Sequence, residues 1–105
     1  MAPHIDPALL PRGWQIEPLR GYTAEKIIRV GYHLTVRVAI AERNGKFSAS
    51  AALKRYINRF TTDHCLATRE RGPLDTQQEA VNMAVAFGEE LVAIGATMKP
   101  LEKSQ

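Results

Sequence analysis

The chain has 105 residues, with 14 basic and 11 acidic side chains and a formal net charge of +3. This length fits one domain with one modest core, and the ordinary charged and apolar fractions, 24% and 45%, disfavour disorder along the whole chain. The one cysteine, Cys65, excludes an intramolecular disulfide and favours a reducing compartment. No apolar run approaches a membrane span and no secretory leader is recognisable, so we expect a cytoplasmic protein without a membrane partner.

Charge is distributed unevenly along the chain. Residues 29–71 hold nine basic and three acidic side chains, whereas residues 72–105 hold two and five. Basic strands followed by an acidic helix are typical of complementary, solvated surfaces. The alternative is that the basic strands bind an anionic partner.

The first third of the chain carries weak signals. Residues 1–13 contain three prolines and little periodicity, which is typical of a mobile lead-in. Residues 14–17 alternate and indicate a short strand, in which Trp14 is expected to be a packing residue. Residues 23–30 allow a short helix or a strand, and the β-branched residues near their end favour the strand. This strand is then expected to be the start of the first hairpin strand, with Gly31 as a bulge or bend within it.

Residues 31–56 predict one long β-hairpin. Apolar residues alternate on both sides of Asn44-Gly45, a pair that suits a two-residue turn with positive φ at both positions. That turn places Arg43 opposite Lys46, and the same register brings apolar residues together on both strands. Turn chemistry and the hydrophobic pattern therefore predict the same register.

A third strand and a helix are predicted after the hairpin. His64–Arg69 reads as a strand with Cys65 buried, and residues 69–73 read as a loop. Thr76 to Glu79 is a capping box that begins a helix ending near Gly95. Gly88 lies inside the apolar stripe of this helix, which indicates a close approach to the sheet.

The predicted fold class is α+β: a three- to four-stranded antiparallel sheet, with the central hairpin at about 31–56 and one C-terminal helix at about 76–95 packed on one face. We expect a mobile lead-in (1–13), a single domain (14–96) and a mobile tail (97–105).

No catalytic constellation is visible in the sequence. His64 and Cys65 are adjacent on a predicted strand, so their side chains point to opposite faces and cannot pair as base and nucleophile. The histidines and the cysteine lack zinc-ligand spacing, and no phosphate-binding loop occurs. We therefore expect a protein that is not an enzyme and has no cofactor or metal.

The candidate binding surface is a cationic face of the hairpin, opposite its apolar face. Cations held there are suited to the phosphates of a nucleic acid, although the face has few aromatic side chains for base stacking. The candidate polyanion-binding residues are Arg37, Arg43, Lys46, Lys54, Arg69 and Arg71.

Three antiparallel strands followed by a long helix, over Gly31 to Gly95, resembles in topology the double-stranded-RNA-binding-domain fold. That family places a lysine cluster where this chain has Thr76 to Glu79, so no functional residue carries over. The segment Leu74 to Ala80 is also similar to the helix start of HicB-type antitoxins and of small uncharacterised bacterial proteins. The bacterial group is the preferred resemblance and implies no known activity.

We accordingly expect a non-catalytic binding or interaction module, monomeric or weakly dimeric. The alternatives are a nucleic-acid-binding protein using the basic sheet face, or an antitoxin-like partner of another protein.

Overall fold

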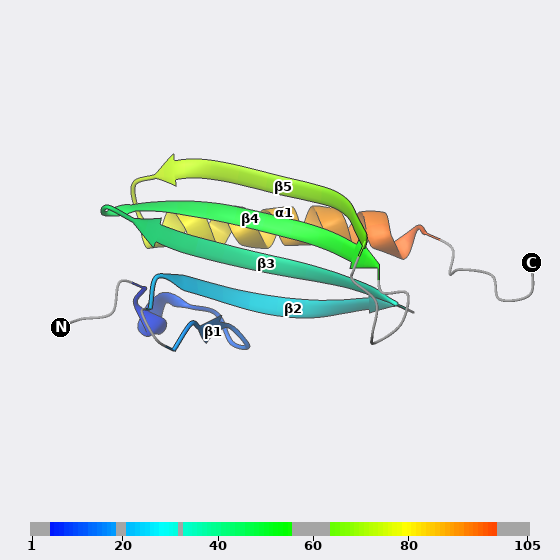
Figure 1. Ribbon diagram of the computed structural model, residues 1–105, viewed down its shortest axis with the longest axis horizontal. Coiled ribbons are helices and arrows are strands. Elements are labelled where there is room, and N and C mark those ends of the chain that lie inside the picture. The colour runs from blue at the N-terminus through cyan, green and yellow to red at the C-terminus, as the bar shows by residue number, and fades with distance from the viewer. Residues whose placement is uncertain (1–4, 19–20, 32, 56–63, 99–105) are drawn as a thin grey trace, which may run out of the picture.

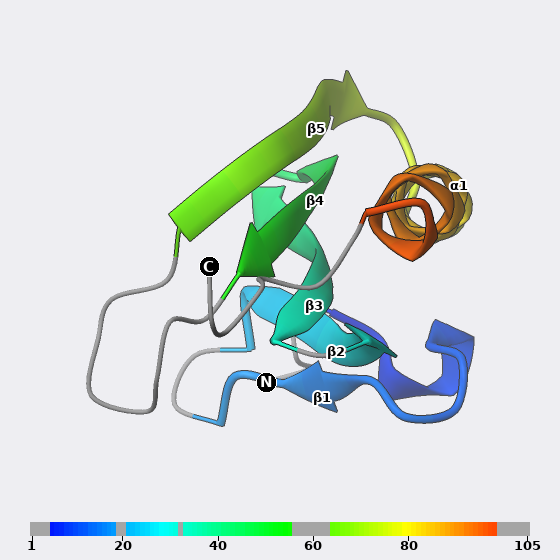
Figure 2. The same cartoon turned by 90° about the vertical axis from the view of Figure 1, so that its right-hand side faces the viewer.

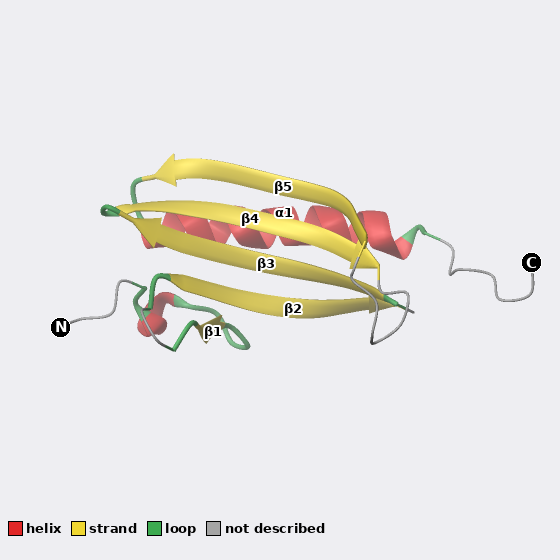
Figure 3. Cartoon of the chain, viewed as in Figure 1, coloured by secondary structure: helices red, strands yellow, loops and turns green. Residues whose placement is uncertain are grey.

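The structure is a computed structural model that describes residues 5–18, 21–31, 33–55 and 64–98. Within these ranges the chain forms an antiparallel sheet with one long helix on one face (Figure 1). The elements are η1 (Pro7–Leu9), β1 (Gln15–Ile16), β2 (Thr23–Gly31), β3 (Leu34–Arg43), β4 (Lys46–Arg55), β5 (His64–Leu74) and α1 (Gln77–Ala96), as Figure 3 shows. The α+β class is confirmed, but the sheet has five strands, in the order β1-β2-β3-β4-β5, rather than three or four.

The predicted hairpin register is confirmed. Arg43 pairs with Lys46, and the pairing continues without a shift to Leu34 and Arg55. Asn44 and Gly45 have φ values of 53° and 80°, the positive range that this two-residue turn requires. Tyr56, at the predicted end of the hairpin, lies outside the described residues.

The two additional strands come from the first third of the chain. Residues 23–31 form β2, so a strand is realised rather than the short helix. This strand is separate from the first strand of the hairpin and pairs antiparallel with it, so the register shift between Arg29 and Gly31 lies at the end of β2 and not within one continuous strand as expected. β1 has only two residues and pairs with the first part of β2. A strand this short carries almost no periodic signal, which explains why its place in the sheet was not predicted firmly.

β5 is longer than expected and contains two irregularities. Residues 69–73, predicted as a loop, continue the strand to Leu74 through a register shift opposite Phe47 and Ala49. A second shift at Leu53 and Lys54 inserts an extra residue near Leu66, which places Cys65 and Ala67 on opposite faces. Cys65 is consequently exposed rather than buried.

The N-terminal segment packs against the domain. Ile5 is fully buried in the core, and its backbone N–H donates to the carbonyl of Gly21 at 3.0 Å. The described part of the predicted lead-in therefore packs on the core. Residues 1–4 and 99–105, at the two ends predicted to be mobile, lie outside the described residues.

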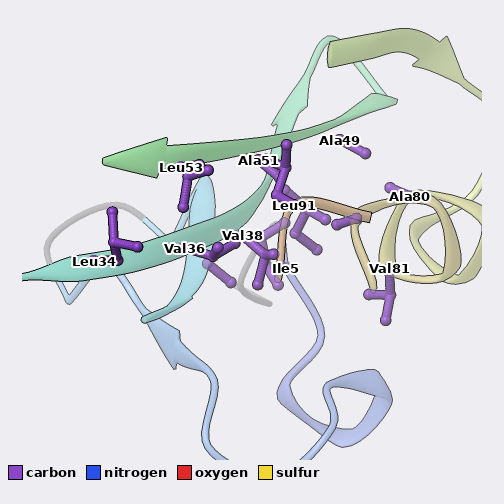
Figure 4. Close-up of a cluster of buried hydrophobic side chains, with 13 residues drawn as sticks. Ile5, Leu34, Val36, Val38, Ala49, Ala51, Leu53, Ala80, Val81 and Leu91 are labelled. Carbon is purple, nitrogen blue, oxygen red and sulfur yellow. The ribbon is translucent and has the colours of Figure 1, made fainter. Parts of the chain in front are cut away.

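The core lies between α1 and the face of β3 and β4 turned toward it. Figure 4 shows valine and leucine side chains of β3 and β4 together with Ala80, Val81 and Leu91 of the helix. The helix begins as predicted: the Thr76 hydroxyl oxygen accepts from the Glu79 backbone N–H at 3.1 Å. In addition, the Thr76 hydroxyl lies 3.1 Å from Glu79 Oε1 and donates to it, so this carboxylate is held by the hydroxyl.

Two glycines allow the helix to approach the sheet closely. A Cβ built on Gly88 would lie 2.6 Å from Cγ1 of Val38, which confirms the predicted close contact. The helix was expected to end near Gly95, and α1 ends one residue later, at Ala96. A Cβ on Gly95 would lie 2.9 Å from Cγ1 of Val30. Gly95 is therefore also a packing residue.

Figure 2 shows α1 on one side of the sheet, with the N-terminal segment on that same side, next to β2. We call the opposite side of the sheet the open face. In the described part of the chain, no helix has the length and apolar character needed to cross a membrane.

Candidate functional site

The six predicted cations do not form one patch. The register of β3 and β4 places Arg37, Arg43, Lys46 and Lys54 on the open face as expected, but Arg43 and Lys54 lie near opposite ends of the hairpin. At about 3.3 Å per residue, the eight steps from Lys46 to Lys54 span roughly 26 Å.

Two of these cations are already paired with acids. Arg37 Nε donates to Glu25 Oε1 at 2.5 Å, and Lys46 Nζ donates to Asp75 Oδ1 at 2.5 Å. The hydrogen bond to Asp75 and its negative charge raise the pKa of Lys46, and the same bond and the ammonium charge lower the pKa of Asp75. Both ion pairs are solvent-exposed, so each adds little to stability but reduces the free positive charge of the face.

Arg69 and Arg71 lie on the other side of the sheet. Arg69 pairs across the sheet with Ala51, and Arg71 with Ala49, two core residues beneath α1. Both side chains therefore belong to the face that carries the helix, where Arg69 Nε comes within 3.9 Å of Glu90 Oε1. Residues 69–73 were predicted as a loop, which is why these two side chains were not assigned to the helix side of the sheet.

One cation that sequence reasoning did not select joins the open face. Arg29 pairs with Thr35, which in turn pairs with Lys54, so Arg29 and Lys54 flank Thr35 in one cross-strand row. Their Cα atoms are about 10 Å apart across two strand spacings. We name Arg29, Arg37 and Lys54 the open-face cluster. The sequence did not indicate this cluster, because β2, which carries Arg29, was not assigned firmly to the sheet.

The described residues form a groove on the helix side of the sheet. It has a volume of about 430 Å³ and lies between α1 and β2. Val85, Glu89 and Val92 line it from the helix, Lys26 and Ile28 line it from β2, and Trp14 lies in its wall. This volume and this mostly apolar lining are typical of ligand-binding sites. We call this feature the α1–β2 groove.

The fold creates the groove because α1 lies over the centre of the sheet. Small residues on β4 and on α1, including Ala49, Ala51, Ala80 and Ala84, let the helix settle there and leave part of β2 uncovered. The N-terminal segment then supplies Pro11 and Trp14 as a further wall. The sequence singled out Trp14 only as a packing residue, since nothing in the pattern places it beside the helix.

Two charged groups interrupt the apolar lining of the groove. Lys26 is half-buried: a Cβ on Gly13 would lie 3.3 Å from its Cε and 3.6 Å from its Nζ, so its stem packs against the N-terminal segment. Glu89 lies on the helix side of the groove and is exposed. Within the described ranges, no ion pair to either group is present.

No metal-ligating cluster of three or more His, Cys, Asp or Glu side chains is found among the residues that the structure describes. Cys65 is exposed on β5, and its thiol is directed at the Ala67 carbonyl at 3.9 Å. The prediction that the protein is not an enzyme stays a prediction.

Comparison with known proteins found no matching family, no matching characterised protein and no matching solved structure.

Proposed function

We propose that this protein is a non-catalytic interaction module that binds an apolar segment of a partner protein in the α1–β2 groove. The observation that carries the proposal is the groove itself: an apolar cavity of about 430 Å³, open to solvent between a helix flank and a strand. Monomeric proteins keep large apolar surfaces covered, so an exposed apolar cavity with a polar rim favours a binding site.

The residues around the groove support a docked protein segment. Val85 is 38% exposed on the helix flank, and Trp14 presents a large, rigid surface on the opposite wall. Aromatic and aliphatic side chains around a pocket are the usual anchors of protein interfaces. An antitoxin-like role would be one special case of such an interaction module.

The test is selection of dodecapeptides from a random phage-displayed library on the wild-type protein. Selected peptides are then measured against Val85→Glu, which introduces a charge into the groove, and Ala86→Glu, which introduces the same charge at an exposed helix position that does not line it. We expect binding to fall at least tenfold for Val85→Glu only. Failure to select any peptide, or equal binding by both variants, would overturn the proposal.

Trp14 provides a direct readout for this experiment. It is the one tryptophan of the chain and lines the groove, so occupancy of the groove should change its emission. Matched melting temperatures of the two variants would establish that lost binding does not reflect unfolding.

The second candidate function is nucleic-acid binding by the open face. The favouring observation is that Arg29 and Lys54 flank Thr35 and have no ion-pair partner among the described residues. The topological likeness to double-stranded-RNA-binding domains points the same way but supplies no matching residues. Arg29→Gln with Lys54→Gln should strongly weaken binding of a 20-base-pair RNA duplex and lower the salt slope of the remaining binding by about two units. Duplex binding that is unchanged, or absent from the wild type, would rule this candidate out.

A further inference from the structure

We infer that the partner segment is an extended peptide, which adds as a strand to the free edge of β2 and places a carboxylate beside Lys26. This inference rests on the proposed function and deepens it. It follows from the position of the α1–β2 groove next to a part of the sheet edge with which none of the described strands pairs.

β1 covers only the first part of the outer edge of β2. The two strands pair at Gln15 with Glu25 and at Ile16 with Ala24, and Glu17 N–H donates to the Thr23 carbonyl at 2.9 Å. Figure 1 shows β2 continuing well beyond β1. Among the described residues, no strand pairs with this edge after Glu25.

The hydrogen-bonding groups of this edge point outward at alternate residues. The carbonyl of Thr23 faces β1, whereas the carbonyl of Tyr22 accepts from Glu42 N–H of β3 at 2.8 Å. Since these directions alternate along a strand, odd-numbered residues of β2 face away from β3. Ile27 and Arg29 therefore present N–H and C=O groups to a strand arriving from solvent, as in known cases of strand addition.

The side chains of β2 connect this edge to the groove. Lys26 and Ile28 pair with Val38 and Val36, so both side chains lie on the helix face, and both line the groove. A strand added beside β2 places every second side chain on that same face. Apolar side chains opposite Ile28 and Val30 would thus enter or border the groove.

Lys26 selects the charge of the ligand. Its ammonium group lies at the end of the groove near Gly13 and has no acidic partner among the described residues. An antiparallel strand would end near Lys26, because β1 already occupies the edge from Glu25 backwards. A terminal carboxylate at that point would pair with the ammonium group.

The edge of β5 is a weaker site for strand addition. Arg69, Glu70 and Arg71 place charges on both sides of it, and Pro73 follows within the strand. Charges and proline protect an edge against pairing.

The probe is a synthetic five-residue peptide that alternates valine and threonine, begins and ends with valine, and has a free terminal carboxylate. Titration monitored by heteronuclear NMR should shift the amides of Ile27, Ile28 and Arg29 and slow amide exchange at Ile27 and Arg29 at least tenfold. A second peptide is N-methylated at its two threonine nitrogens, which face β2 when the valine side chains lie on the groove side. It keeps the side chains but cannot donate these two hydrogen bonds. It should bind at least tenfold more weakly.

Two protein variants complete the test. Ile27→Pro removes an outward N–H that does not pair with β3 and should weaken the peptide about threefold to tenfold, whereas the control Ile27→Thr keeps that N–H and should bind normally. Lys26→Gln should weaken binding of the peptide with a free terminal carboxylate and should not change binding of the same peptide with a terminal amide. Melting temperatures establish that each variant is folded.

The outcomes separate this inference from the proposed function. Equal binding of the methylated peptide, no binding of the parent peptide, or unchanged exchange at Ile27 and Arg29 would overturn strand addition. If library peptides still bind in a manner sensitive to Val85→Glu, the interaction module survives with a different ligand conformation. The ratio of the affinities for the acid and amide forms of the peptide should be lower in Lys26→Gln than in the wild type. If the two proteins give the same ratio, Lys26 does not bind the terminal carboxylate.

Discussion

The side-chain amide of Gln77 holds the backbone of Asp6 through two hydrogen bonds. Gln77 Oε1 accepts from the Asp6 N–H at 2.7 Å, and Gln77 Nε2 donates to the Asp6 carbonyl at 2.8 Å. Gln77 is only 6% exposed, so both polar atoms of its amide are satisfied inside the structure. This pair joins the N-terminal segment to the first residue of α1.

Gln77→Ala should lower the free energy of unfolding by about 1–3 kcal/mol. Each lost hydrogen bond contributes about 0.5–1.5 kcal/mol, and the Asp6 backbone groups would be left without these partners. The control is Gln78→Ala, which removes an exposed bond to Asn82 at 3.0 Å and should cost at most about 0.5 kcal/mol. Urea denaturation followed by circular dichroism measures both. Equal effects of the two substitutions would mean that the N-terminal segment is not held through Gln77.

Gly88→Ala should destabilise the protein although alanine favours helix. Alanine gains about 1 kcal/mol in helix propensity over glycine, but its Cβ would lie 2.6 Å from Val38 Cγ1. Overpacking of this kind costs about 1–3 kcal/mol, so we expect a net loss in thermal denaturation.

A double-mutant cycle with Val38→Ala tests the cause of that loss. Removing Cγ1 of Val38 should relieve the contact, giving a favourable coupling of about 1 kcal/mol between the two substitutions. Additive effects, or a stabilised Gly88→Ala protein, would contradict the close packing of helix and sheet.

The Lys46–Asp75 ion pair should make a small, pH-dependent contribution to stability. The folded-state pKa of Asp75 is lowered from 3.8 by the hydrogen bond and charge of Lys46, so its contribution is present above 3.8 and is lost as the pH falls through the lower folded value. The pKa of Lys46 is raised from 10.5 by the same bond, so its contribution is complete below 10.5 and is lost as the pH rises through the higher folded value.

Asp75→Asn should therefore lower the melting temperature slightly between these two pKa values and have no effect in strong acid. Because both groups are fully exposed, 0.5 M salt should reduce the difference. Differential scanning calorimetry of both proteins across the pH range provides the measurement. A difference that persists at the acid end would assign the effect to something other than this ion pair.

The hairpin and the helix were predictable because several local signals agree there. Asn44-Gly45 defines the turn, the apolar alternation gives the same register, and Thr76 with Glu79 marks the helix start. β5 was only partly predictable, since its two register shifts depend on the partner strand and not on its own sequence. The two-residue β1 is too short to have a period.

The candidate site was less predictable than the fold. Four of the six candidate cations lie where they were expected, because the hairpin register places them on the open face. The ion pairs of Arg37 and Lys46 depend on Glu25 and Asp75, which are distant in sequence. The groove combines Trp14 with residues of β2 and α1, and only tertiary packing brings these three segments together.

The sheet is a meander: every hydrogen-bonded pair of strands is also consecutive in the chain. Such pairings close short loops, so they can form early during folding, whereas Asp6 and Gln77 are separated by 71 residues. The contact between these two residues should consequently form after the rate-limiting step. Stopped-flow measurements on Gln77→Ala should then show faster unfolding at a nearly unchanged folding rate. The contact of the N-terminal segment with α1 therefore slows unfolding and determines how long the folded state persists.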